Sequence, residues 1–96
     1  MEVAYTVLYH PLVVREDLPA LDATVKVRIR HAIELKLQTA PDLYGIPLRR
    51  SLKGHRKLRV GEYRVVFRLE KKHVMIVAIQ HRSKIYQHLD SRVGTR

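Results

Sequence analysis

With 96 residues, the chain is long enough for one domain with one modest core. Its hydrophobic fraction of 46% and charged fraction of 29% exclude an intrinsically disordered chain, and the absence of cysteine excludes disulfides and thiolate zinc sites. The net charge of +10 belongs to one half, because residues 1–48 hold 5 Lys and Arg against 6 Asp and Glu, whereas residues 49–96 hold 14 against 3. Such a basic half is typical of nucleic-acid binders, although a solvated surface or a site for an acidic protein would carry the same charge.

We expect residues 1–96 to form a single cytoplasmic domain. The first residues lack the basic start and apolar run of a secretory signal. No apolar stretch is long enough to span a bilayer, so we expect no membrane partner. The lack of cysteine agrees with a reducing compartment.

The first half of the chain predicts a strand followed by two helices. Residues 3–9 hold Val or Tyr at every second position within a β-prone run, which indicates a strand. Residues 12–18 lie between two prolines and predict a short helix. A longer helix capped by Asp22 or Thr24 should run to about residue 38, because its apolar residues recur at helical spacing. A short connection makes the two helices an antiparallel hairpin that lies on a sheet.

The second half predicts a loop, three strands and a final helical turn. Residues 40–54 hold two Pro and two Gly and should form a loop. Strands are expected over residues 56–60, 63–70 and 73–80, and a helical turn or two over residues 83–89. The order β-α-α-β-β-β-α predicts an α+β fold with a mostly antiparallel sheet, the helical hairpin on one face and a basic concave face opposite.

Four cations should share that second face of the sheet. Side chains alternate along a strand, so Lys57 and Arg59 point the same way, as do Arg64 and Arg68 on the next strand. A tight hairpin would place all four side by side, where a bound polyanion would relieve their repulsion. An ordinary solvated sheet face is the alternative.

An aromatic residue close in sequence to this face adds to the nucleic-acid hypothesis. Tyr86 follows Arg82 beyond the third of these strands, where the chain can return to the sheet. Exposed aromatic rings beside cations stack on the bases of single-stranded nucleic acids. A tyrosine that packs in the core is the competing interpretation.

The segment from residue 52 to 86 resembles the RelE/ParE toxin superfamily. Its motifs are KLRVGEYR at residues 57–64, the apolar strand after it, and HRSKIY at residues 81–86, whereas the first half of the chain is similar in layout only. The resemblance implies a toxin of a type II toxin–antitoxin system. Such a toxin would cleave mRNA on the ribosome, inhibit translation without a metal or other cofactor, be neutralised by a cognate antitoxin, and meet operator DNA only through that antitoxin.

The resemblance also extends to individual functional residues. The positions that match basic and aromatic residues of RNA-cleaving members are Lys57, Arg59, Arg64, Arg82 and Tyr86. The nearby cations Lys53, Arg56 and Arg68 are further candidates for RNA binding. Gln80 departs from the pattern, because some members carry a basic residue two places before the position of Arg82. This departure makes His81 an additional candidate proton donor.

A metal-independent mechanism would use the 2′-hydroxyl of the RNA as nucleophile. The protein must then remove a proton, stabilise charge on the phosphate and assist the leaving oxygen. Arg59 and Arg64 are expected on the phosphate, and Lys57 would be the base if neighbouring cations favour its neutral form. Arg82 or His81 would assist the leaving group, and Tyr86 would stack on a base.

Two other functions agree with the same sequence. One is a ParE-like inhibitor of DNA gyrase, with the same fold and no nuclease activity. The other is a nucleic-acid-binding domain that has lost catalysis, which Gln80 would allow. The six histidines show no metal-binding spacing, so we expect neither a metal nor a cofactor.

Overall fold

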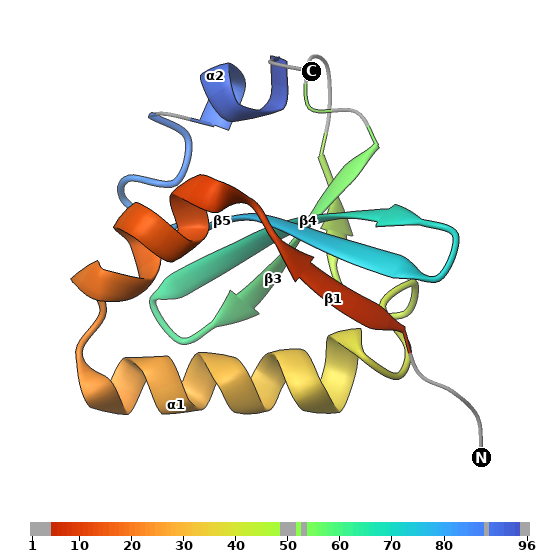
Figure 1. Ribbon diagram of the computed structural model, residues 1–96, viewed down its shortest axis with the longest axis horizontal. Coiled ribbons are helices and arrows are strands. Elements are labelled where there is room, and N and C mark those ends of the chain that lie inside the picture. The colour runs from red at the N-terminus through yellow and green to blue at the C-terminus, as the bar shows by residue number, and fades with distance from the viewer. Residues whose placement is uncertain (1–4, 49–51, 53, 88, 95–96) are drawn as a thin grey trace.

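The computed structural model describes residues 5–48, 52, 54–87 and 89–94, which form a five-stranded sheet with helices on both sides (Figure 1). The strands are β1 (Thr6–Tyr9), β2 (Ile46–Pro47), β3 (His55–Val60), β4 (Tyr63–Glu70) and β5 (His73–His81). The helical segments are η1 (Val13–Asp17), η2 (Leu18–Ala20), α1 (Ala23–Ala32), η3 (Ile33–Leu37) and α2 (Leu89–Gly94). None of these helices is long and apolar enough, within the described part of the chain, to cross a membrane.

The sheet has the order β1-β5-β4-β3-β2, and the predicted antiparallel character is confirmed for four of its strands. The remaining strand, β1, runs parallel to β5. Gly61 has a φ of +61° in the turn between β3 and β4, a conformation that glycine adopts without strain. The short strand β2 lies within residues 40–54, which were predicted to form a loop. Its two residues form a strand because they pair with β3, a contact that no local sequence pattern reveals.

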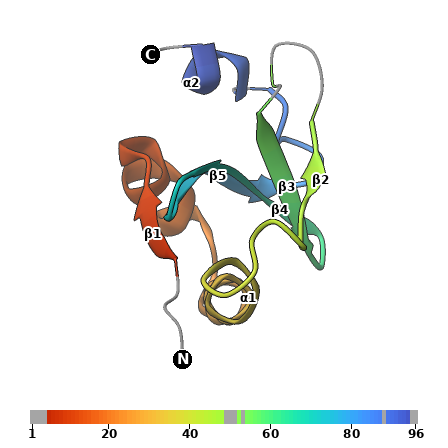
Figure 2. The same cartoon turned by 90° about the vertical axis from the view of Figure 1, so that its right-hand side faces the viewer.

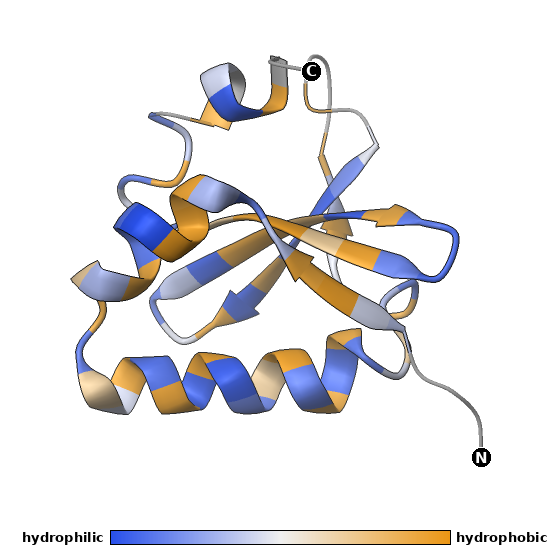
Figure 3. Cartoon of the chain, viewed as in Figure 1, coloured by the Kyte–Doolittle hydropathy of each residue, from blue (hydrophilic) through white to orange (hydrophobic). Residues whose placement is uncertain are grey.

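Of the predicted helical hairpin, the longer arm (α1 and η3) covers one face of the sheet, whereas η1 and η2 lie beside β5. Asp22 caps α1, since its side chain accepts a hydrogen bond of 2.9 Å from the backbone N–H of Val25. Hydrophobic and hydrophilic residues alternate along the helix (Figure 3). The apolar side of α1 and η3 packs on the inner side of β3, β4 and β5 through buried residues that include Ile29, Leu37 and Phe67.

The last helix differs from its prediction. A helical turn or two was expected over residues 83–89, but residues 82–87 form turns and the helix begins at Leu89. Figure 2 shows α2 on the opposite side of the sheet from α1. There Leu89 and Ile85 form a second core with Val66 and Val77 of the sheet. The prediction of a basic concave face opposite the helical hairpin is therefore correct only in part, because α2 and this small core cover some of the second face.

Candidate functional site

Three predicted cations lie together on the uncovered part of the second face. Arg59 of β3 stands directly opposite Arg64 of β4, and Lys57 stands opposite Val66, which packs against α2 on this same face. Arg59 is exposed, while Lys57 and Arg64 are half-buried. Strand alternation and hairpin register thus produce the basic cluster that the sequence predicted.

Lys57 is held against Tyr86, which arrives from the turns after β5. The Lys57 ammonium donates a hydrogen bond of 2.8 Å to the Tyr86 hydroxyl and lies 5.3 Å from the centre of its ring. The tyrosine side of this contact remains 49% exposed. An accessible aromatic ring is thereby fixed beside a cation, which is the combination that single-stranded nucleic-acid sites use.

Arg64 is oriented by the turn that precedes it. Its Nη1 atom donates to the carbonyl oxygens of Gly61 at 3.0 Å and Tyr63 at 2.9 Å. A guanidinium carries five N–H donors, so these two bonds fix its direction and leave it able to contact a phosphate.

Arg82 is engaged by an acid in the structure. Its Nε donates to Glu62 Oε1 at 2.7 Å, and its backbone N–H donates to the Glu62 carbonyl oxygen at 2.8 Å. The hydrogen bond from Arg82, followed by the charge of Arg82, lowers the pKa of Glu62. Both side chains are largely exposed, at 60% and 65%. Because exposed ion pairs are weak, a phosphate can compete with Glu62 for Arg82.

His81 lies away from the basic cluster. Its ring contacts Tyr63 edge-on, with the ring centres 5.4 Å apart, and Tyr63 packs against the core on the α1 side of the sheet. The backbone N–H of Ser83 donates to His81 Nδ1 at 3.1 Å, so the neutral ring carries its proton on Nε2. Successive strand residues face opposite sides, which separates His81 from Arg64.

Two of the three remaining candidates, Arg56 and Arg68, lie away from the cluster. Arg56 points to the α1 side, where its Nη1 donates to the Gly45 carbonyl oxygen at 3.5 Å. Arg68 shares the second face, as predicted, but it lies at the far end of β4 opposite His55 and forms an ion pair of 2.9 Å with Glu70. Lys53 lies outside the described residues.

A buried ion pair that the sequence analysis missed joins the two ends of the chain. Asp17 of η1 binds Arg92 of α2 through both carboxylate oxygens, with N–O distances of 2.7 and 2.9 Å. Arg92 Nη1 also donates to the Val77 carbonyl oxygen at 3.0 Å. The two side chains are only 2% and 3% exposed. No local pattern could reveal a pair whose members lie 75 positions apart in the chain.

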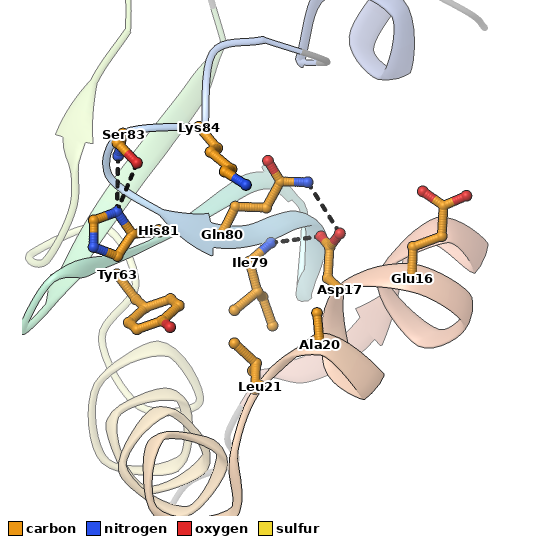
Figure 4. A pocket seen from close by; sticks show the side chains of 10 residues that line it. All are labelled: Glu16, Asp17, Ala20, Leu21, Tyr63, Ile79, Gln80, His81, Ser83 and Lys84. Carbon is orange, nitrogen blue, oxygen red and sulfur yellow. Dashed lines mark hydrogen bonds between the residues drawn. The ribbon is translucent and has the colours of Figure 1, made fainter.

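The same carboxylate fixes two groups of β5 (Figure 4). Asp17 accepts a hydrogen bond of 2.8 Å from the Ile79 backbone N–H and one of 3.1 Å from Gln80 Nε2. Burial by itself would raise the pKa of Asp17, but the hydrogen bonds from Arg92, Ile79 and Gln80, together with the charge of Arg92, outweigh it and lower that pKa. Asp17 is therefore an ionised acceptor at neutral pH.

Among the described residues, no group of three or more His, Asp or Glu side chains is arranged to hold a metal ion. The chemistry open to this site is that of guanidinium, ammonium, phenol and imidazole groups around a cationic sheet face. Such groups can bind phosphates, stabilise negative charge and transfer protons.

Comparison with known proteins identifies the family. The family described as the ParE toxin of the type II toxin–antitoxin system parDE matches residues 5–86. This chain belongs to that family. The toxin is also 33% identical over 75 residues to toxin RelG of Mycobacterium tuberculosis, a match that covers 76% of this chain and 86% of RelG. The resemblance to the RelE/ParE toxin superfamily is thus confirmed, and the protein is a toxin of a type II toxin–antitoxin system.

Solved structures agree with this assignment. The toxin–antitoxin complex RelBE2 of Mycobacterium tuberculosis contains a chain that matches with a TM-score of 0.77 and 30% identity, covering 86% of this toxin and 97% of that chain. A mutant of the E. coli toxin RelE in the free state matches with a TM-score of 0.71 over 93% of this toxin and 97% of that chain. Its identity is 19%, so this second match supports the α+β fold alone.

Proposed function

We propose that this toxin is a metal-independent endoribonuclease that cleaves mRNA on translating ribosomes and so inhibits translation. The observation that carries the proposal is the contact between Lys57 and Tyr86 beside the Arg59–Arg64 pair. It combines a base-stacking surface with phosphate-binding cations on one face of the sheet. The similarity to toxin RelG supports the RelE-like branch.

In the proposed mechanism the RNA supplies its own nucleophile, the 2′-hydroxyl next to the scissile phosphate. Arg59 and Arg64 bind the phosphate and stabilise the charge that develops on it. Lys57 in its neutral form removes the proton of the hydroxyl, and Tyr86 stacks on a base and holds the strand open.

The leaving oxygen is assisted by Arg82 in this scheme. The amide of Gln80 carries no transferable proton, and its nitrogen already donates to Asp17. His81 lies on the α1 side of the sheet, against Tyr63. Arg82 is exposed beyond the end of β5 and can release Glu62 to bind the leaving oxygen. Its N–H groups would stabilise the negative charge on that oxygen, which then takes a proton from water.

The proposed partner in the cytoplasm, where ribosomes work, is a cognate antitoxin. Solved relatives of this fold are toxin–antitoxin complexes, including RelBE2. With a net charge of +10, the toxin attracts a partner segment that carries acidic residues. Operator DNA would be bound through the antitoxin rather than by this chain.

A second candidate function follows from the family match itself, since the matching family is described as the ParE toxin. A ParE-like toxin would inhibit DNA gyrase by binding it and would leave mRNA intact. The two functions make opposite predictions in two simple assays.

The test is a cell-free translation reaction with the purified toxin, in which primer extension maps the 5′ ends of the mRNA. We expect new cuts within the coding region that disappear with Arg64→Ala. Arg15→Ala, a change at an exposed arginine of η1, is the matched control and should cut like the wild type. A folded wild-type toxin that makes no cuts would overturn the proposal. A gyrase supercoiling assay with the same protein would then test the alternative.

A further inference from the structure

A cleft lies where β5 extends beyond its neighbour β1. The parallel pairing with β1 ends at Ile76, whereas β5 continues to His81. The segment η1–η2 lies beside this end of β5 and leaves a cleft of about 530 Å³ between them (Figure 4). Its lining comes from η1, η2, β4, β5 and the turns after β5.

The lining of the cleft combines apolar and polar parts. Leu21 and Ile79 provide an apolar floor, and the Tyr63–His81 ring pair forms one aromatic wall. Gln80 and Lys84 provide polar groups along the rim (Figure 4). Pockets that bind small planar ligands have this composition, with apolar faces for the ring and a few polar atoms at its edge.

Gln80 lines this cleft with an amide group of fixed direction. Its Nε2 donates to the Asp17 carboxylate, which is ionised and cannot donate in return. The amide oxygen must therefore point away from Asp17, as Figure 4 shows. Because Asp17 is itself held by Arg92 in the buried ion pair, this orientation is built into the fold rather than induced by a ligand.

The cleft adjoins the basic cluster at Gln80. In the sheet register Gln80 stands directly opposite Arg64, which in turn stands opposite Arg59. Neighbouring strands lie about 5 Å apart. When the phosphate of one nucleotide lies on these arginines, the next nucleotide of the RNA can therefore reach Gln80. Gln80 thus links the two sites at the edge of the sheet, because it faces the same side as the two arginines and also lines the cleft, whose floor and Tyr63–His81 wall belong to the α1 side.

We propose that this cleft binds one nucleobase of the RNA, with the Gln80 amide oxygen accepting a hydrogen bond from an N–H group of the base. The proposal rests on the proposed function in taking RNA as the ligand of the basic cluster. Tyr63 and the apolar floor contact the base, while Asp17 acts as a positioning residue for Gln80. The cleft then contributes to the base preference of the toxin at a position separate from the Tyr86 stack.

The test measures RNA binding without ribosomes and without cleavage. Fluorescence anisotropy would follow the binding of labelled 2′-O-methyl hexanucleotides of A, C, G or U, which lack the hydroxyl required for cutting. Ala20→Phe fills the cleft from an exposed position, and Gln80→Met removes the acceptor while keeping the side-chain length. Ala23→Phe and Gln38→Met make the same chemical changes outside the cleft. Thermal denaturation would confirm that each variant is folded.

We expect Gln80→Met to weaken binding of the preferred hexanucleotide by about three- to tenfold, the value of one hydrogen bond, and to reduce the differences among the four. Ala20→Phe should weaken it at least as much, and both controls should stay within about twofold of the wild type. Unchanged affinity and base preference in both cleft variants would overturn the proposal, as would a wild type that binds none of the four. Because no cleavage is involved, an absence of mRNA cuts would refute the proposed function without altering this result.

Discussion

The buried pair between Asp17 and Arg92 should be a principal determinant of stability. Arg92→Leu removes both hydrogen bonds to Asp17 and the one to Val77, and leaves a carboxylate that is only 2% exposed without its cation. Breaking a buried pair by removing one partner costs about 3–5 kcal/mol, a large share of the roughly 5–15 kcal/mol that stabilises a domain of this size. At about 4–8 °C per kcal/mol, the midpoint of thermal unfolding should fall by about 12 °C or more.

The assay is urea and thermal denaturation at pH 7, followed by circular dichroism. The double variant Asp17→Asn with Arg92→Leu should be more stable than Arg92→Leu, because the remaining amide can still accept from Ile79 and no buried charge is left. The exposed Arg15→Leu control should stay within about 0.5 kcal/mol of the wild type. A loss below about 1 kcal/mol in Arg92→Leu, or a double variant less stable than the single one, would refute this account of the ion pair.

Three further predictions concern pH, the Tyr86 ring and a glycine. The pKa of Asp17 is lowered in the folded state, so the ionised Asp17 stabilises the fold fully above its unfolded pKa near 3.8. This stabilisation is lost as the pH falls through the folded pKa. In urea titrations, acid should therefore destabilise the wild type more than the Asp17→Asn, Arg92→Leu double variant. Tyr86→Phe should keep hexanucleotide affinity within about twofold and Tyr86→Leu should lower it about tenfold, since stacking needs the ring and not the hydroxyl; equal losses would contradict stacking. Gly45→Ala should be about 1–3 kcal/mol more destabilising than Gly54→Ala in denaturation experiments. Both glycines have a positive φ, but only at Gly45 would a Cβ lie 2.8 Å from the buried Phe67 ring. Equal effects of the two substitutions would exclude a clash with Phe67 as the cause.

The sequence alone determined the features that depend on neighbouring residues. The bounds of β4 follow from alternation between two turns, and the start of α1 follows, to within two residues, from the two capping candidates Asp22 and Thr24, of which the structure uses Asp22. The same alternation placed Lys57, Arg59 and Arg64 on one face, because a tight hairpin leaves a single register in which their strands pair.

Only the tertiary structure decided the features that depend on distant segments. The strand β2 exists because β3 offers it hydrogen bonds, and α2 begins later than predicted because its apolar side packs on the second face of the sheet. The pairing of Asp17 with Arg92, and through it the direction of Gln80, joins groups that are more than 60 positions apart. Such contacts depend on where packing brings the chain together, whereas periodicity and capping act within one element.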